Sequence, residues 1–265
     1  MTQDPKQDLD IGFEAAEVNT VSTLFKASLK MFFDNFWQIA FLVTVVYLPV
    51  ELIKNILLFG ANQQDNWKIT FRVESFISAV ISPLLIPALV YMLVYNKKNG
   101  EYPPLTESLK WGMSKWGRVF GVNFISGAAI IGGLILLVVP GIMFAVWFSL
   151  AAVMVSIEGL QQEHPLEKSR ALTKGHRWML FFTYCSGYLL FIAAAILVGV
   201  VEAIFDISNA YLTTFSDVIF DVMLEFLTVT SILAYLHFRK TEAAVKTSAE
   251  PIKEAGSNVP KDTQL

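Results

Sequence analysis

The sequence predicts an all-α, polytopic membrane protein whose six transmembrane helices form three hairpins, each preceded by a cytoplasmic amphipathic helix. Of the 265 residues, 54% are hydrophobic and 16% are charged, whereas a soluble domain has about 25% charged residues. The apolar residues also fall in runs of about 20, the length that a helix needs to cross a hydrocarbon core. Lysine and arginine are distributed unevenly between these runs. Together these observations predict one membrane domain over residues 21–238.

The first third of the chain contains a polar tail, an amphipathic segment and two spans. Residues 1–20 lack the basic start and short apolar core of a secretory signal. From Val21 onward, apolar residues recur at helical spacing with lysines opposite, which predicts an amphipathic helix lying on the membrane surface. Transmembrane helices are expected over residues 35–60 and 75–95.

The middle of the chain repeats this pattern. Residues 102–118 have an apolar stripe at helical spacing and predict a second amphipathic helix, followed by a span over 119–139. Pro140 and Gly141 predict a tight turn into a fourth span over 142–157. One unbroken helix over both spans would be almost twice as long as the hydrocarbon core is thick.

The last third begins with a polar, basic segment over 158–178, in which a third cytoplasmic helix is expected. Spans over 179–205 and 217–238 complete the set of six. Residues 239–265 are polar with few apolar residues, which predicts a disordered tail.

The basic residues indicate how the chain is oriented. Six spans place both tails, 96–118 and 158–178 on one side, and all of the 20 lysines and arginines lie there except Lys54, Lys68 and Arg72. The positive-inside rule then predicts that both termini are cytoplasmic. These basic residues also suggest a collar that faces anionic lipid headgroups, each contributing about 1 kcal/mol. The alternative is that they act only as topology signals.

Three segments share a layout that suggests an internal repeat. Each expected cytoplasmic helix carries a serine, and a tryptophan follows eight or nine residues later near the mouth of a span: Ser28 and Trp37, Ser108 and Trp116, Ser169 and Trp178. The alternative is that helices, serines and interfacial tryptophans recur in any membrane protein.

Charged residues inside the expected spans predict a candidate intramembrane polar site. Asp217, Asp221 and Glu225 are spaced four residues apart and form an acidic stripe on the sixth span, while Glu51 and Lys54 lie one turn apart on the first. All five are expected toward the side opposite the basic collar. Charges within spans are costly and mark functional sites by default. The alternative is that the outermost of them sit in the hydrated interface.

No pattern of catalytic or metal-binding residues is present. The single cysteine, Cys185, lies in an apolar run and is expected to pack as a small hydrophobe. Zinc-type and redox-type spacings, the HExxH and GxSxG motifs and a phosphate-binding loop are all missing. We therefore expect no cofactor, no metal, no nucleic-acid partner and no enzymatic activity.

The second half of the chain carries a pattern that resembles a known family. The residues that carry the resemblance are Pro140, Gly141, Glu158, Gly159, Ser169, Leu172, Gly175 and Trp178. The pattern resembles six-span bacterial inner-membrane proteins of the YciC type and the membrane domain of membrane-anchored glycerophosphoryl diester phosphodiesterases. The resemblance implies a bacterial inner-membrane location. It implies no catalytic residues, because the phosphodiesterase activity belongs to a separate soluble domain that we expect this chain to lack.

Three functions remain open from the sequence. The first is a non-enzymatic module that holds lipid or a protein partner, or a second copy of itself, in membrane or envelope homeostasis. The alternative is a small transporter or proton-coupled carrier that uses the acidic stripe, and the third is a membrane-embedded lipid-processing enzyme. A scaffold should pair its buried charges, whereas a carrier should leave acidic groups accessible in the middle of the membrane.

Overall fold

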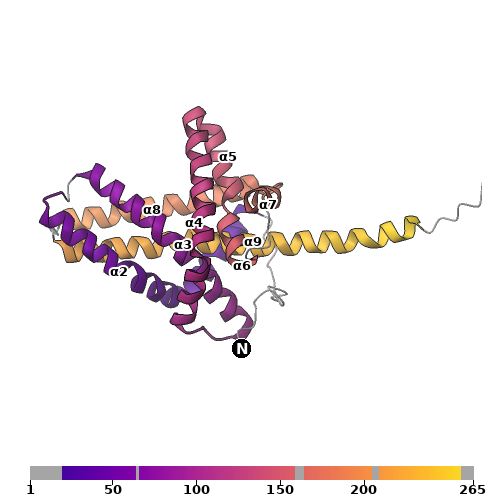
Figure 1. The fold of residues 1–265 in the computed structure, drawn as a ribbon, viewed down its shortest axis with the longest axis horizontal. Helices are drawn as coiled ribbons and strands as arrows, with labels where there is room; N and C mark the ends of the chain where they lie inside the picture. The colour runs from indigo at the N-terminus through magenta and orange to yellow at the C-terminus, as the bar shows by residue number, and fades with distance from the viewer. Residues whose placement is uncertain (1–19, 64–65, 159–163, 205–208, 258–265) are drawn as a thin grey trace, which may run out of the picture.

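The computed structural model describes residues 20–63, 66–158, 164–204 and 209–257, and in these residues every regular element is a helix. The helices are α1 (Val21–Asp34), α2 (Phe36–Gly60), α3 (Trp67–Asn99), α4 (Leu105–Leu136), α5 (Val138–Phe148), α6 (Ala151–Glu158), α7 (Pro165–Leu172), α8 (Arg177–Ile204) and α9 (Ala210–Ser257). Figure 1 shows their arrangement. The all-α prediction is confirmed. Six helical stretches are long and apolar enough to cross a membrane.

The first predicted boundaries agree well with the structure. Helix α1 begins at Val21, where the Thr20 hydroxyl accepts a hydrogen bond from the Thr23 backbone N–H and the two residues form a reciprocal cap. The first span, expected over 35–60, is α2. The second is longer than expected, because α3 extends beyond 75–95 in both directions and ends at Gly100, which has a left-handed φ of 73°.

The separate amphipathic helix expected over 102–118 is not confirmed. Residues 105–136 form one continuous helix, α4, without a break before the third span. The physical reason is that this stretch contains no proline, and helix formation continues more easily than it starts anew. The amphipathic stripe is therefore the first half of a long helix.

The turn between α4 and α5 lies at Leu137, a few residues before the expected Pro140 and Gly141. Leu137 is extended, with φ −160° and ψ 142°, and its N–H donates to the carbonyl of Gly133 at 2.9 Å. Pro140 falls in the first turn of α5, where a backbone N–H has no intrahelical acceptor in any case. A Cβ on Gly133 would lie 2.9 Å from the Cα of Gly141, so the two backbones approach closely here.

The fourth span consists of two helices rather than one. Helix α5 ends at Phe148 and α6 begins at Ala151, so the stretch expected as one helix over 142–157 is interrupted at residues 149–150. Together, residues 138–157 are long and apolar enough to cross a membrane.

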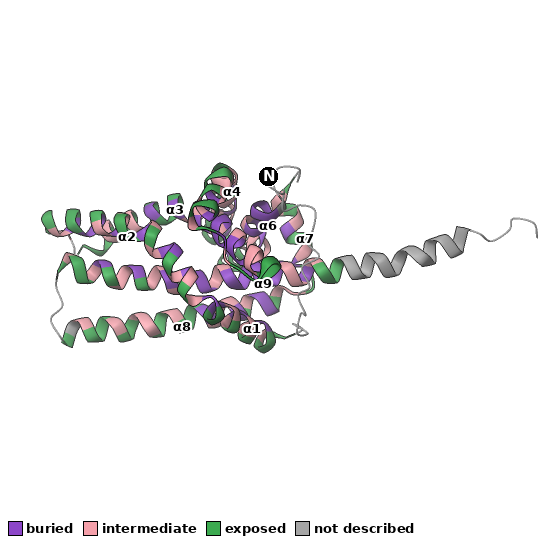
Figure 2. Ribbon diagram, turned by 90° about the horizontal axis from the view of Figure 1, so that it is seen from below, coloured by how far each residue is buried: buried purple, intermediate pink, exposed green. Residues whose placement is uncertain are grey.

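The long helices do not all run in one direction. Helices α2, α8 and the first part of α9 lie side by side, whereas the second half of α4 and α5 project across that direction as one arm (Figures 1 and 2). The tip of this arm, over residues 131–139, carries exposed apolar side chains. The pairing of all six spans into three hairpins stays a prediction.

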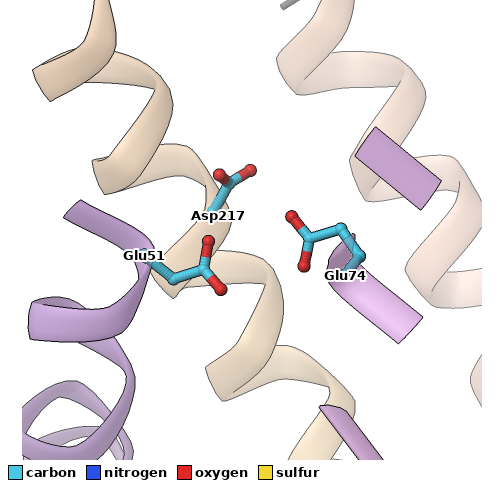
Figure 3. A group of neighbouring side chains, drawn as sticks. All are labelled: Glu51, Glu74 and Asp217. Atoms are coloured by element: carbon cyan, nitrogen blue, oxygen red, sulfur yellow. The ribbon is translucent and has the colours of Figure 1, made fainter. Parts of the chain in front are cut away.

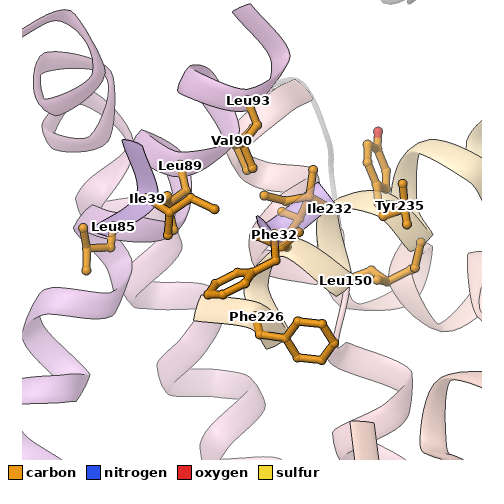
Figure 4. Packing of buried hydrophobic residues seen from close by; sticks show 14 of the residues in the cluster. Phe32, Ile39, Leu85, Leu89, Val90, Leu93, Leu150, Phe226, Ile232 and Tyr235 are labelled. Carbon is orange, nitrogen blue, oxygen red and sulfur yellow. The ribbon is translucent and has the colours of Figure 1, made fainter. Parts of the chain in front are cut away.

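The core lies where α1, α2, α3, α6 and α9 meet, and the end of α5 and the start of α8 also contribute to it (Figure 4). Helix α1 contributes Leu24, which is fully buried, and its Phe25 and Phe32 rings stand edge-on to Phe226 of α9 at 5.5 and 6.0 Å. The apolar face of α1 therefore packs on protein, and a surface-lying role for this helix is not confirmed.

Much apolar surface remains exposed outside this core. Figure 2 shows long exposed stretches on α8, which includes exposed Leu189, Ile196 and Leu197. Such large apolar faces are rare on soluble monomers, whereas side chains that face lipid are normally apolar. This distribution fits a chain whose surrounding solvent is a bilayer.

The chain after the sixth span also differs from the expectation. Residues 239–265 were expected to be disordered, but α9 continues through Ser257, while residues 1–19 and 258–265 lie outside the described part. The stretch is rich in alanine, lysine and glutamate, which are good helix formers. It also extends a helix that already exists, so it bears no cost of nucleation.

Candidate intramembrane charge cluster

Lys54 is buried and stands at the centre of a group of charges. Its ammonium forms ion pairs with Glu51 on its own helix, with Glu74 on α3 and with Asp217 on α9, the last at 2.8 Å between Nζ and Oδ2. Lys54 is 4% exposed and Glu51 is 1% exposed. Figure 3 shows the three carboxylates pointing toward one another from α2, α3 and α9. We call these four residues the charge cluster.

An amide and a hydroxyl extend the charge cluster between α2 and α9. The Nδ2 of Asn55 donates to Oδ2 of Asp217 at 2.8 Å and lies 3.1 Å from Oγ1 of Thr214, to which it also donates. Asn55 and Thr214 are both buried. One oxygen of Asp217 thus accepts from an ammonium and an amide, which fixes its position more strongly than one partner would.

The three carboxylates have the spacing of a cation site. One oxygen from each of Glu51, Glu74 and Asp217 lies within 4.8 Å of the others, and carboxylate oxygens are the usual ligands of Ca²⁺ and Mg²⁺. The ammonium of Lys54 already pairs with each of them, so a cation belonging to the protein takes the place that a metal ion would take. With all groups ionised, the charge cluster retains an excess of negative charge.

The inner part of the acidic stripe is not paired in this way. Asp221 and Glu225 follow Asp217 on successive turns of α9, and Glu225 is 7% exposed. Oδ2 of Asp221 and Oε2 of Glu225 are buried and accept no hydrogen bond from any residue that the structure describes. A buried carboxylate oxygen without a donor is costly unless it is protonated or meets a cation.

The structure thus brings together Glu51, Lys54 and Asp217 among the residues chosen from the sequence. Asp221 and Glu225 lie further along α9. The role of these five residues as a functional site stays a prediction.

Glu74 was missed because the second span was expected to begin at the next residue. Continuing the helix backward to Trp67 would have placed Glu74 inside it. Asn55 and Thr214 were missed because single polar residues in spans carry no spacing signal.

The residues of the family-like motif have structural roles. Ser169 donates from Oγ to the carbonyl oxygen of Trp147 at 2.7 Å. Gly175 has a φ of 92°, which favours glycine. Leu172 packs against the core, and Trp178 is 74% exposed. Glu158 ends α6. Gly159 lies outside the described residues, and Pro140 and Gly141 lie near the start of α5, which begins at Val138.

The serines of the suggested repeat share one environment. Ser28, Ser108 and Ser169 are all buried, with at most 1% exposure. Near Ser108 the helices approach so closely that a Cβ on Gly112 would lie 2.5 Å from the carbonyl oxygen of Leu84. The serines therefore lie at helix contacts, where small side chains allow close packing. This agrees with the repeat, which stays an interpretation.

The helices and their apolar surfaces define the class of the chain, which is a multi-pass integral membrane protein. No family model, no curated protein and no solved structure matches the chain. The similarity to YciC-type proteins and to the membrane domains of phosphodiesterases therefore stays an expectation from the sequence.

Proposed function

We propose that the chain is a non-enzymatic module of the bacterial inner membrane that holds lipid or a protein partner and contributes to membrane or envelope homeostasis. Both termini would face the cytoplasm. The observation that carries the proposal is the pairing of Lys54 with three carboxylates from three different helices. The charged residues of α2, α3 and α9 thus form ion pairs with one another.

This pairing is the arrangement expected of a scaffold. Burying charges costs several kcal/mol for each ion, and removing one partner of a buried pair typically costs about 3–5 kcal/mol. Lys54 therefore holds α2, α3 and α9 in one relative position. A transported cation would have to displace an ammonium that is covalently attached to the site. The exposed apolar faces of α8 and of the α4–α5 arm are the surfaces through which lipid or a partner would be held.

A second candidate function is supported by one specific observation. Asp221 and Glu225 each retain a buried oxygen without a donor among the described residues. Carboxylates at such positions in pumps and transporters relay protons. A proton-coupled carrier would use these two residues, with the charge cluster as the outer end of its path. No observation favours a membrane-embedded lipid-processing enzyme, which remains the third alternative.

Reconstitution into liposomes separates the first two candidates. The purified chain is inserted into vesicles that contain a pH-sensitive dye, and proton entry is followed after a pH gradient and a membrane potential are applied. For a scaffold we expect the rate of protein-free vesicles, with phospholipid retained on the protein through purification in mild detergent. Proton entry that disappears in Glu225→Gln, but not in the control Glu202→Gln, would overturn the proposal in favour of a carrier.

A further inference from the structure

Two arginines from different helices lie against the same tryptophan ring. The guanidinium carbon of Arg170, on α7, is 4.2 Å from the ring centre of Trp147, and that of Arg177, at the start of α8, is 4.7 Å from it. Trp147 belongs to α5. Cation–π contacts of this kind stabilise by about 0.5–2 kcal/mol. Three helices thus place two positive charges around one indole.

The two positive charges have no negative partner among the described residues. They lie at most about 9 Å apart and repel one another. The described residues supply no ion pair to either guanidinium, and the polar contact of Arg177 is a donation from Nη2 to the carbonyl oxygen of Arg170 at 3.5 Å. An arrangement that holds like charges together without an anion is suited to receive one.

Two buried donors point to the same conclusion. The Nε of Arg177 and the indole Nε1 of Trp147 are both buried, and neither donates a hydrogen bond to any described residue. Leaving a buried donor without an acceptor costs about 1–3 kcal/mol. A phosphate group offers several acceptor oxygens and matches the planar fork of a guanidinium. It could satisfy both donors while neutralising the arginines.

The backbone around the two arginines is fixed rather than loose. Ser169 joins α7 to α5 through its hydrogen bond to the carbonyl of Trp147, directly beside Arg170. A turn then reverses the chain: the N–H of His176 donates to the carbonyl of Thr173 at 3.0 Å, and Gly175 has the left-handed φ that such a turn needs. This turn returns the chain so that Arg177 meets Arg170.

The site lies level with the end of the apolar part of a spanning helix. The ring of His176 stacks on Phe238 of α9 with 4.4 Å between ring centres. The apolar part of α9 ends at Phe238, and Arg239 and Lys240 follow. The two arginines are therefore level with the point at which a spanning helix becomes polar. Trp178, exposed beside them, is a residue type that is enriched at this level.

We propose that Arg170, Arg177 and Trp147 form a binding site for the phosphate of an anionic lipid headgroup at the cytoplasmic face. The proposal rests on the proposed lipid-holding function and assigns that function to three residues. The chemistry would also suit free inorganic phosphate. The position at the apolar boundary favours the lipid, because the acyl chains of a bound lipid would continue along exposed apolar helix faces.

The test uses the full chain in nanodiscs or detergent and measures bound lipid by native mass spectrometry. Phosphatidylglycerol is the anionic probe, phosphatidylcholine the zwitterionic one, and inorganic phosphate the soluble one. The double variant Arg170→Gln/Arg177→Gln should lose at least about tenfold in phosphatidylglycerol affinity. The matched double variant Lys26→Gln/Lys30→Gln removes two exposed charges from α1 and should change this affinity much less. Trp147→Phe keeps an aromatic ring for the arginines to stack on but removes the indole N–H, and it should weaken binding by a few-fold.

Several outcomes would overturn the proposal. Equal losses in both double variants would mean that a diffuse basic surface attracts the lipid. Full displacement of the lipid by millimolar phosphate would identify a site for the free anion. If the double variant does not fold, Arg170→Lys keeps the charge but not the fork, and unchanged affinity in that variant contradicts the proposed geometry.

The wild-type chain separates this proposal from the general function. If the wild type retains phosphatidylglycerol and the arginine variants retain as much, the site is wrong while the lipid-holding function stands. If the wild type loses both lipids to the detergent micelles, both proposals fail.

Discussion

The Nζ of Lys54 lies 2.8 Å from Oδ2 of Asp217, although 163 residues separate them in the chain. Because Glu51 and Glu74 pair with the same ammonium, one side chain links α2, α3 and α9. A lysine in this position acts as an internal counter-ion for three carboxylates.

Removing this counter-ion should destabilise the chain. Lys54→Met keeps the length of the side chain but leaves the buried carboxylate of Glu51 and the half-buried carboxylates of Glu74 and Asp217 without their cation. We expect a loss of about 3–5 kcal/mol in the free energy of unfolding. Thermal unfolding in detergent would measure it. The control is Lys68→Met, which removes an exposed lysine at the start of α3, the helix that carries Glu74. Similar melting temperatures for the two variants would contradict the prediction.

The α4–α5 arm offers a matched pair of glycines. Gly133→Ala would place a Cβ 2.9 Å from the backbone of Gly141 and should separate the two helices at a cost of about 1–3 kcal/mol. Gly132 has open space around it, so Gly132→Ala should be neutral or stabilise the helix by up to about 1 kcal/mol. Unfolding of both variants is compared with the wild type. Equal effects would show that the close approach of the arm is not required.

The stacking of His176 on Phe238 should make stability depend on pH. Burial lowers the pKa of the His176 imidazole below its ordinary value of about 6.5, so the unfolded chain takes up a proton at a higher pH than the folded chain. The stabilisation is therefore complete above pH 6.5 and is lost as the pH falls below that value. His176→Phe keeps the stack without a titrating group and should flatten this dependence. Melting temperatures between pH 5 and 8 provide the measurement, and parallel curves for the two proteins would argue against it.

The orientation can be tested with single cysteines in a Cys185→Ser background. In intact cells, a membrane-impermeant maleimide should label Lys68→Cys and fail to label Lys174→Cys until the cells are opened. Both lysines are exposed in the structure, so a difference in labelling reports the side of the membrane. Labelling of Lys174→Cys from outside would contradict the topology predicted by the positive-inside rule.

The sequence predicted the parts of the structure that depend on local composition. Six apolar stretches and an all-helical chain follow from the thickness of a bilayer. The spacing of Asp217, Asp221 and Glu225 on one helix face follows from helical geometry. Glu51 and Lys54 were expected near these acids, and the structure places both of them beside Asp217.

Other features depend on contacts between distant segments and could not be predicted. The composition of α4 and α5 does not indicate that they project across the direction of the other long helices, because the same apolar surface suits any arrangement that lipid covers. The role of Glu74 depended on where α3 begins, and helix ends are the least certain feature of a sequence-based assignment. The pairing of Arg170 and Arg177 on Trp147 depends on the turn at Gly175, which only the folded backbone reveals.

Helix α9 runs without interruption from Ala210 to Ser257. It therefore joins the Lys54–Asp217 ion pair to the polar stretch after Phe238 through one continuous helix. From Asp217 to Glu242 this helix is about 38 Å long at 1.5 Å per residue. Between Asp217 and Glu242 the helix contains no proline or glycine, so it has no break at which these two points could move relative to one another. A force applied to the polar stretch after Phe238 would therefore be transmitted to Asp217, and through it to the ammonium of Lys54.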